Sequence, residues 1–118
     1  MAVGQAALTI YQGDDYAANI TVMQADRMTP ADLTGYTAQS QIRSSPQSSI
    51  AAAQFATSIA ANIISIVLSH DATRALTSTS YVWDLQIIDA SGWITTLLAG
   101  PVQITKEVTK IYNSTGRR

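Results

Sequence analysis

The sequence predicts an all-β fold: an antiparallel β-sandwich or small barrel of seven to eight strands, immunoglobulin-like or jelly-roll-like, with one short helical turn. The 118 residues, 47% of them hydrophobic, suffice for one core, so we expect a single domain over residues 1–118. Thr, Ser and Ala are abundant, whereas one Glu and two Lys are poor material for surface helices. Segments in which apolar and polar residues alternate recur about every ten residues and are separated by clusters of Gly, Pro, Asn, Asp and Ser. This spacing is typical of sandwiches and barrels.

The first strands are expected at residues 8–11 and 16–24, which flank a turn at residues 12–15. In the second strand, the two-residue period places Tyr16, Ala18, Ile20 and Val22 on one face. Residues 36–43 continue the pattern. Their inward face is Tyr36, Ala38, Ser40 and Ile42, and their outward face, towards solvent or a partner, is Thr37, Gln39, Gln41 and Arg43.

The middle of the chain predicts further strands and one helical turn. Ile64, Ile66 and Leu68 are the inward set of a strand at residues 63–68, and residues 54–59, which include Phe55, form a weaker strand pattern. Residues 51–53 are compatible with a helix instead. Residues 69–76 break the two-residue period and carry Ser and Asp at capping positions, which predicts a single helical turn between two strands.

The clearest strand covers residues 81–89. Its inward face is Tyr81, Trp83, Leu85 and Ile87, and its outward face is Val82, Asp84 and Gln86. A turn at residues 89–92 predicts an antiparallel hairpin with a returning strand at residues 93–98. Residues 99–101 include Pro101 and interrupt the run, so the last strand is expected at 102–108. Residues 1–5 and 112–118 show little apolar pattern and are expected to be arms.

Six large residues are available to fill the core: Trp83, Tyr81, Tyr36, Tyr16, Phe55 and Trp93. Trp93 follows a turn glycine, and the alternative for it is an exposed aromatic that recognises a partner. Asp84 lies in mid-strand between apolar neighbours. It either faces outward into solvent or forms a cross-strand or intersubunit pair with an arginine such as Arg43 or Arg74.

Residue types that support catalysis are scarce. The absence of cysteine excludes thiol catalysis, cysteine-ligated metals and disulfides. His70 is the only histidine and lies between Ser69 and Asp71, but neighbours in sequence seldom converge as a triad. The Asp14–Asp15 pair lacks the further ligands of a calcium loop and is better explained as a turn. We therefore expect no catalytic, cofactor-binding or metal-binding residues, no cofactor, and no enzymatic activity.

The charge is unevenly distributed. Residues 1–100 hold three basic and seven acidic residues, whereas residues 101–118 hold four basic and one acidic residue. Four charges without interleaved aromatic residues are too few for nucleic-acid recognition, so we expect no nucleic-acid partner. No apolar run approaches the length of a membrane span, and no basic residue precedes Arg27, so we expect no membrane partner and no secretion signal.

The outward strand positions carry Thr, Ser, Gln and Ala rather than Lys and Glu. Free monomers usually carry more charge, and charged residues are depleted in the centres of protein interfaces, so this surface suits a permanently assembled subunit. The candidate partner-binding residues are Gln39, Gln41 and Arg43 on one strand, and Lys106, Lys110, Arg117 and Arg118 in the basic tail, residues 106–118.

Several short motifs follow one another along the chain, and their order is informative. A Gly-Asp turn at residues 12–15 is followed by Leu-Thr-Gly at 33–35 with Ile42-Arg43, by Tyr-Val-Trp-Asp-Leu at 81–85, and by Asp-Ala-Ser-Gly at 89–92. Gly-Pro-Val-Gln-Ile at 100–104 and Val108-Thr109 complete the series. Over residues 8–109 the chain resembles the small β-sandwich virion proteins of tailed bacteriophages, which include capsid cement or decoration proteins and the N-terminal domain of baseplate upper proteins.

The resemblance implies a non-enzymatic structural protein made in the host cytoplasm and located on the capsid surface of the virion. Its partners would be the major capsid protein and copies of itself, arranged as a trimer, and it would bind the outer shell and join neighbouring capsid subunits. A length of 118 residues favours this cement role over a tail or baseplate adaptor, which is the alternative. A cellular carbohydrate- or peptide-binding β-sandwich module is the alternative from another class.

Overall fold

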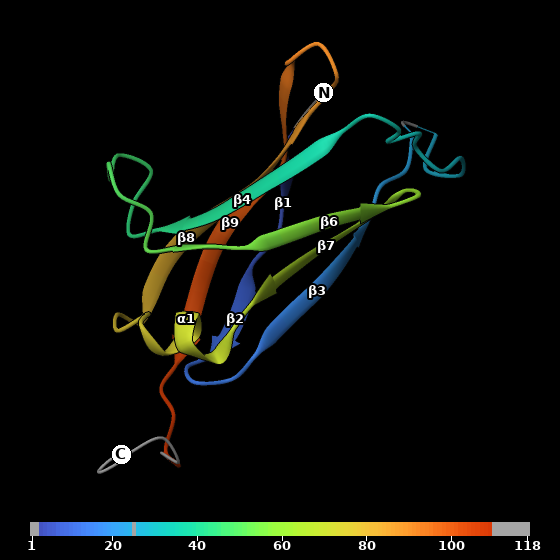
Figure 1. Ribbon diagram of the computed structural model, residues 1–118. Coiled ribbons are helices and arrows are strands. Elements are labelled where there is room, and N and C mark those ends of the chain that lie inside the picture. Colours follow the sequence, from blue (N-terminus) through green and yellow to red (C-terminus); the bar gives the residue numbers. More distant parts are fainter. Residues whose placement is uncertain (1–2, 25, 110–118) are drawn as a thin grey trace.

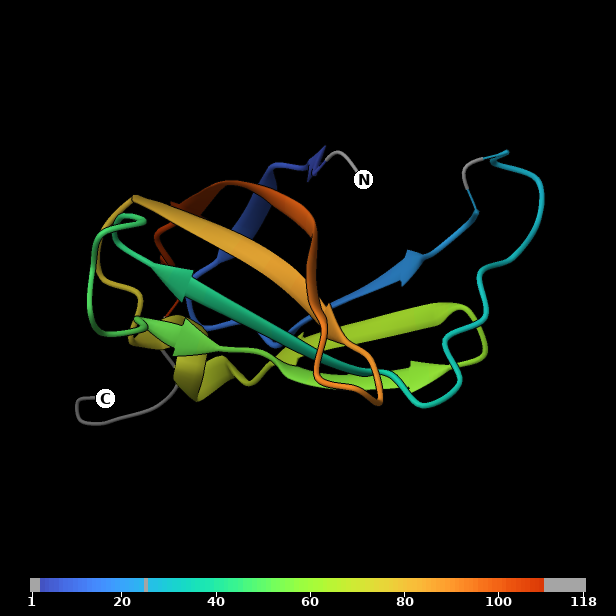
Figure 2. The ribbon, with the colours of Figure 1, turned by 90° about the horizontal axis from the view of Figure 1, so that it is seen from above.

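The computed structural model describes residues 3–24 and 26–109, and these residues form two β-sheets and one short helix (Figure 1). The strands are β1 (Gly4–Gln5), β2 (Leu8–Tyr11), β3 (Tyr16–Thr21), β4 (Thr37–Arg43), β5 (Ala53–Gln54), β6 (Ala56–Ala60), β7 (Ile63–Leu68), β8 (Ser80–Ile88) and β9 (Ile94–Thr105), and the helix is α1 (His70–Arg74). Sheet A has the order β1-β9-β8-β4-β5, with β2 also paired to β9, and sheet B has the order β3-β7-β6. The view from above shows β4 and β8 lying over β6 and β7, which confirms the all-β sandwich (Figure 2).

The hairpin of β8 and β9 follows the sequence prediction closely. The two strands pair antiparallel from Ser80 opposite Gln103 to Ile88 opposite Ile94, with a register shift between Leu85 and Gln86. The inward face of β8 is also confirmed, because Tyr81, Trp83, Leu85 and Ile87 are buried.

Strand β9 is longer than predicted, because it runs without interruption through Gly100 and Pro101. Proline lacks an N–H and should weaken a central strand. Here Pro101 lies where the neighbour of β9 changes: β1 pairs with Leu98 and Ala99, and β2 pairs from Val102 onward. The missing donor therefore falls in the gap between two partners, and the predicted break at residues 99–101 is wrong.

The N-terminal segment is also more ordered than predicted. Gly4 and Gln5 form β1, and β1 and β2 both pair with β9 in parallel, which departs from the expected purely antiparallel pairing and from an arm at residues 1–5. The described residues hold nine strands rather than seven or eight, because β1 was not anticipated and the predicted strand 54–59 is divided, while β9 merges two predicted strands. Residues 112–118, the predicted C-terminal arm, lie outside the described residues.

Phe55 marks the point where the chain crosses from one sheet to the other. It lies between β5, which pairs with β4 in sheet A, and β6, which pairs with β7 in sheet B. Its backbone N–H donates to the carbonyl oxygen of Ser40 at 2.9 Å, and its side chain is buried. This crossing divides the weak strand predicted at 54–59, and it leaves residues 51–53 non-helical.

Helix α1 confirms the predicted helical turn. Ser69 is its N-cap, and the hydroxyl of Ser69 accepts from the N–H of Ala72 at 3.2 Å. The buried hydroxyl of Thr73 accepts from the N–H of Gly13 at 3.0 Å and donates to the carbonyl oxygen of Asp14 at 2.8 Å. The helix therefore fixes the β2–β3 turn, through which the chain passes from sheet A to sheet B.

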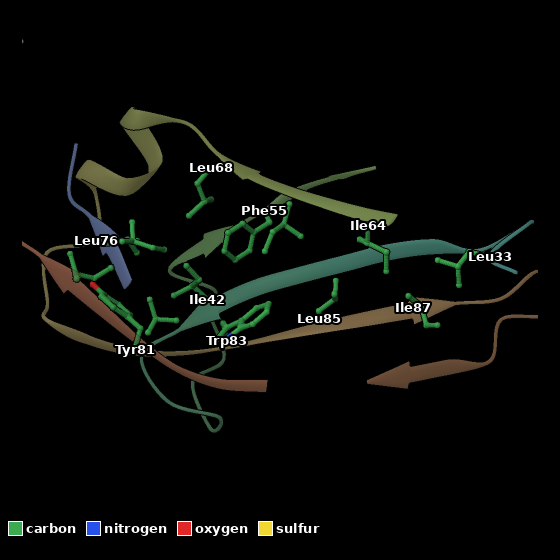
Figure 3. Packing of buried hydrophobic residues seen from close by; sticks show 14 residues of the cluster. Leu33, Ile42, Phe55, Ile64, Leu68, Leu76, Tyr81, Trp83, Leu85 and Ile87 are labelled. Carbon is green, nitrogen blue, oxygen red and sulfur yellow. The ribbon is translucent and has the colours of Figure 1, made fainter. Parts of the chain in front are cut away.

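The core lies between the two sheets and combines the inward residues of both (Figure 3). Phe55 joins its aromatic members, since its ring centroid is 6.2 Å from that of Trp83 and 6.2 Å from that of Tyr16. The predicted inward residues of β7 are confirmed as fully buried or nearly so. The buried core is Ile10, Leu33, Ile42, Phe55, Ile64, Ile66, Leu68, Leu76, Tyr81, Trp83, Leu85, Ile87, Val102 and Ile104.

Candidate functional site

A groove of about 550 Å³ lies on the outer face of sheet A, over β4, β8 and β9. The strand residues that face it are opposite one another in the register, with Gln39 beside Gln86 and Gln41 beside Asp84. On β9 the adjoining positions are Ala99 and Gly100, which fill little space, and Pro46 lines the groove from the loop after β4. The groove forms because the residues on β9 are small, whereas those on β4 and β8 have larger side chains.

Three of the seven predicted partner-binding residues meet in this groove: Gln39, Gln41 and Arg43. The two-residue period of β4 directs them outward, as predicted, because Ser40 and Ile42 between them are buried. The guanidinium of Arg43 donates to Oε1 of Gln41 at 2.7 Å and to the carbonyl oxygen of Ser48 at 2.7 Å. Arg43 is therefore held in place at the groove.

Asp84 supplies the carboxylate of the groove. Partial burial raises the pKa of Asp84 above the ordinary aspartate value, and the positive charge of Arg43 partly offsets this rise. The outward position predicted for Asp84 is confirmed. Arg74 is not its partner, because Arg74 forms ion pairs with Asp71 and Glu107.

Of the four predicted partner-binding residues in the basic tail, one, Lys106, lies in the described part of the chain. Its side chain is exposed, and its amine donates to the backbone carbonyl oxygen of Thr77 in the same chain. Lys110, Arg117 and Arg118 lie outside the described residues, so their predicted contact with a partner stays a prediction.

The outer face of sheet B is a second candidate surface, which the sequence did not predict. Its three rows across the strands are Ala17–Val67–Ala56, Asn19–Ser65–Ser58 and Thr21–Ile63–Ala60. None of these nine residues is ionisable, and all are exposed except Ser65, which is half-buried. The alternation within each strand was visible in the sequence, but the pairing that makes one continuous face was not.

Trp93 is not part of the core, which corrects its expected place among the core residues. It is 73% exposed, and its neighbour Ile94 is 58% exposed. Trp93 lies just after the β8–β9 turn, beyond the last pair of the hairpin at Ile88 and Ile94, where sheet B does not cover it. The alternative of an exposed aromatic is the one that agrees with the structure.

His70 lies in a small polar cluster at the other end of the molecule. Its Nδ1 and its backbone N–H both contact Oδ1 of Asp15, at 2.9 and 2.7 Å, and these hydrogen bonds lower the pKa of Asp15. Asp71 lies 3.8 Å from Nε2 of His70 and 3.0 Å from Arg74. The cluster ties α1 to the β2–β3 turn, with no serine hydroxyl hydrogen-bonded to His70 among the described residues.

Within residues 3–24 and 26–109, no group of three or more His, Asp or Glu side chains could hold a metal ion. No helix in the described part of the chain is long and apolar enough to cross a membrane. Comparisons with protein-family models and with curated protein sequences find no match to this chain.

Proposed function

We propose that the chain is a non-enzymatic structural subunit of a tailed-phage virion, which binds the outer capsid shell and joins neighbouring major capsid subunits. The observation that carries this proposal is the outer face of sheet B, where nine adjoining residues include no charge. A solvated sheet face usually carries charged residues, and their depletion is typical of the centre of a protein interface. The resemblance of residues 8–109 to phage β-sandwich proteins supplies the identity of the partner.

The proposed mechanism is a contact that is complete only in the closed shell. A subunit that binds the assembled shell, and not the separated capsid subunits, stabilises the shell by mass action and slows its opening. Many copies of a modest contact then add up to substantial resistance against pressure from packaged DNA.

The test is binding of the purified chain to capsids of its virus that lack it, measured as occupancy by cryo-electron microscopy. Val67 is the central residue of the first row of the sheet B face, and it is 43% exposed. A Val67→Asp substitution would place a charge on the central strand of the proposed interface, so we expect occupancy to fall at least about tenfold without loss of the fold.

Two controls define the outcome. Val67→Thr keeps the shape without a charge and should retain most of the occupancy, and Gln103→Glu adds a charge on sheet A, away from the face. Equal occupancy for the wild type and Val67→Asp would remove sheet B from the interface. Density at the tail or baseplate instead of the shell would assign the adaptor role, and binding to a glycan array without binding to particles would assign the carbohydrate-binding role.

A further inference from the structure

The end of the β8–β9 hairpin presents an exposed apolar pair, Trp93 and Ile94, and it stands clear of the neighbouring strands (Figure 1). Tryptophan is among the residues most enriched at the energetic centres of protein interfaces. A turn in water does not need a large exposed apolar side chain, so the tip of this hairpin is a candidate anchor for a binding partner.

The turn that carries Trp93 is held rigidly by Asp89. The carboxylate oxygen Oδ1 of Asp89 accepts from the N–H of Ser91 at 2.9 Å, from the Ser91 hydroxyl at 2.6 Å and from the N–H of Trp93 at 2.9 Å. The N–H of Asp89 donates to the carbonyl oxygen of Trp93 at 3.0 Å. Because the backbone of Trp93 is already ordered, binding through its ring costs little conformational entropy.

The groove on sheet A has the chemistry that an indole ring requires. Val82, Ala99 and Pro46 offer apolar surface, and the volume of about 550 Å³ lies within the range of about 300–1,000 Å³ typical of ligand pockets. The carboxylate of Asp84 can accept from the indole N–H. Arg43, fixed by Gln41 and Ser48, can stack its guanidinium on the ring face.

We propose that the chain associates with itself by inserting Trp93 of one copy into the sheet A groove of a second copy. The occupant is a second copy because the groove holds a matching acceptor, cation and apolar wall for Trp93, whose side chain is more exposed (73%) than that of Tyr11 (57%). The use of this contact to join neighbouring copies on a shell rests on the proposed function, whereas the contact itself can be tested on the isolated chain.

The contact is expected to be weak in solution. One tryptophan buries about 150–250 Å², which is well below the roughly 1,200–2,000 Å² of a stable interface. We therefore expect self-association with a Kd of about 0.01–1 mM. Such a contact becomes effective where copies are already held close together.

The experiment is sedimentation equilibrium of the purified full chain up to about 1 mM, together with tryptophan fluorescence. Trp93→Ala removes the anchor, and Ala99→Leu fills the groove from an outward position on β9. Each should weaken self-association at least about tenfold. Mixing the two variants should restore association between unlike copies, because one supplies an intact groove and the other an intact Trp93.

Two further variants complete the design. Met28→Ala removes another exposed apolar side chain, 82% exposed, and should leave association unchanged. Arg43→Gln tests the groove independently if Ala99→Leu does not fold, and it should weaken association. On association, the emission of Trp93 should shift to shorter wavelength as the ring leaves water.

Three results would overturn the inference. The first is a wild-type chain that stays monomeric at about 1 mM. The second is loss of association in Trp93→Ala without any loss in the groove variants Ala99→Leu and Arg43→Gln, and the third is no association when Trp93→Ala is mixed with a folded groove variant. None of these results affects shell binding through sheet B, which Val67→Asp tests separately, so failure of this inference and failure of the proposed function can be told apart.

Discussion

Trp83 and Trp93 lie on the same hairpin in opposite environments. Trp83 is 4% exposed, and its indole N–H donates to the carbonyl oxygen of Ala6 at 2.8 Å, whereas Trp93 is 73% exposed. Buried tryptophans usually find such an acceptor, because an unpaired N–H in the core is costly. Substituting each tryptophan in turn therefore separates effects on the stability of the fold from effects on binding.

We predict that Trp83→Ala destabilises the fold by about 3–5 kcal/mol, because it removes a large core side chain and leaves a cavity beside Phe55. Trp93→Ala should change the free energy of unfolding by less than about 0.5 kcal/mol, since its ring makes no core contact. Urea unfolding of the two variants provides the measurement. Similar losses in both would mean that the inward face of β8 is assigned incorrectly.

Asp84 gives stability a pH dependence of defined sign. Burial raises its pKa in the folded chain above the unfolded value of about 3.9. The ionised carboxylate therefore opposes folding above the raised pKa, and this cost disappears as the pH falls below the unfolded pKa.

We predict that Asp84→Asn, which has the same shape without the charge, raises Tm at neutral pH, and that the difference from the wild type shrinks as the pH falls below the unfolded pKa of about 3.9. The gain should be a few degrees at most, because Asp84 is partly exposed and its charge is screened by solvent and by Arg43. Asp14→Asn in the exposed β2–β3 turn is the control. Thermal melts in which the Asp84→Asn variant gains nothing at neutral pH would contradict the prediction.

At the scale of the element, β9 organises sheet A. It pairs with β8 on one side and with β1 and β2 on the other, and the change from β1 to β2 occurs beside Gly100. A Cβ added at Gly100 would lie 2.1 Å from the carbonyl oxygen of Ala6. The close approach of two backbones explains why glycine is required there, and it places the acceptor for Trp83.

We predict that Gly100→Ala destabilises the chain by about 1–3 kcal/mol, because the Ala6 backbone must move away from β9. Gln103→Ala, at an exposed position on the same strand, is the control. Hydrogen exchange should show faster exchange at the Ala6 amide, which donates to the carbonyl oxygen of Ala99. Unchanged protection there would show that the strand tolerates the methyl group.

Strands and the helix were predictable from the sequence where the pattern of residues within one segment was sufficient to identify it. The inward residues of β4, β7 and β8 follow the two-residue period, and the N-cap of α1 follows from Ser69. The division at Phe55 and the continuity of β9 through Pro101 were not predictable, because each depends on which strands lie alongside. A proline is tolerated in β9 only because its missing donor faces a gap between two partners.

At the scale of the whole molecule, the two candidate surfaces lie on opposite faces of the sandwich. The groove opens on the outer face of sheet A, and the uncharged face belongs to sheet B. A subunit with two independent faces can bind a shell with one and another copy with the other. Because the two proposed contacts involve different faces, the substitutions at Val67 and Trp93 are expected to act separately.

The sequence by itself determined the sandwich class, the inward residues of the principal strands and the outward direction of Gln39, Gln41 and Arg43, because these follow from local periodicity and composition. Only the tertiary structure decided that these three residues share a groove with Asp84, that Trp93 is exposed, and that nine uncharged residues form one face. Those features depend on strand order and register between segments distant in the chain, and periodicity within one strand carries no information about its neighbours.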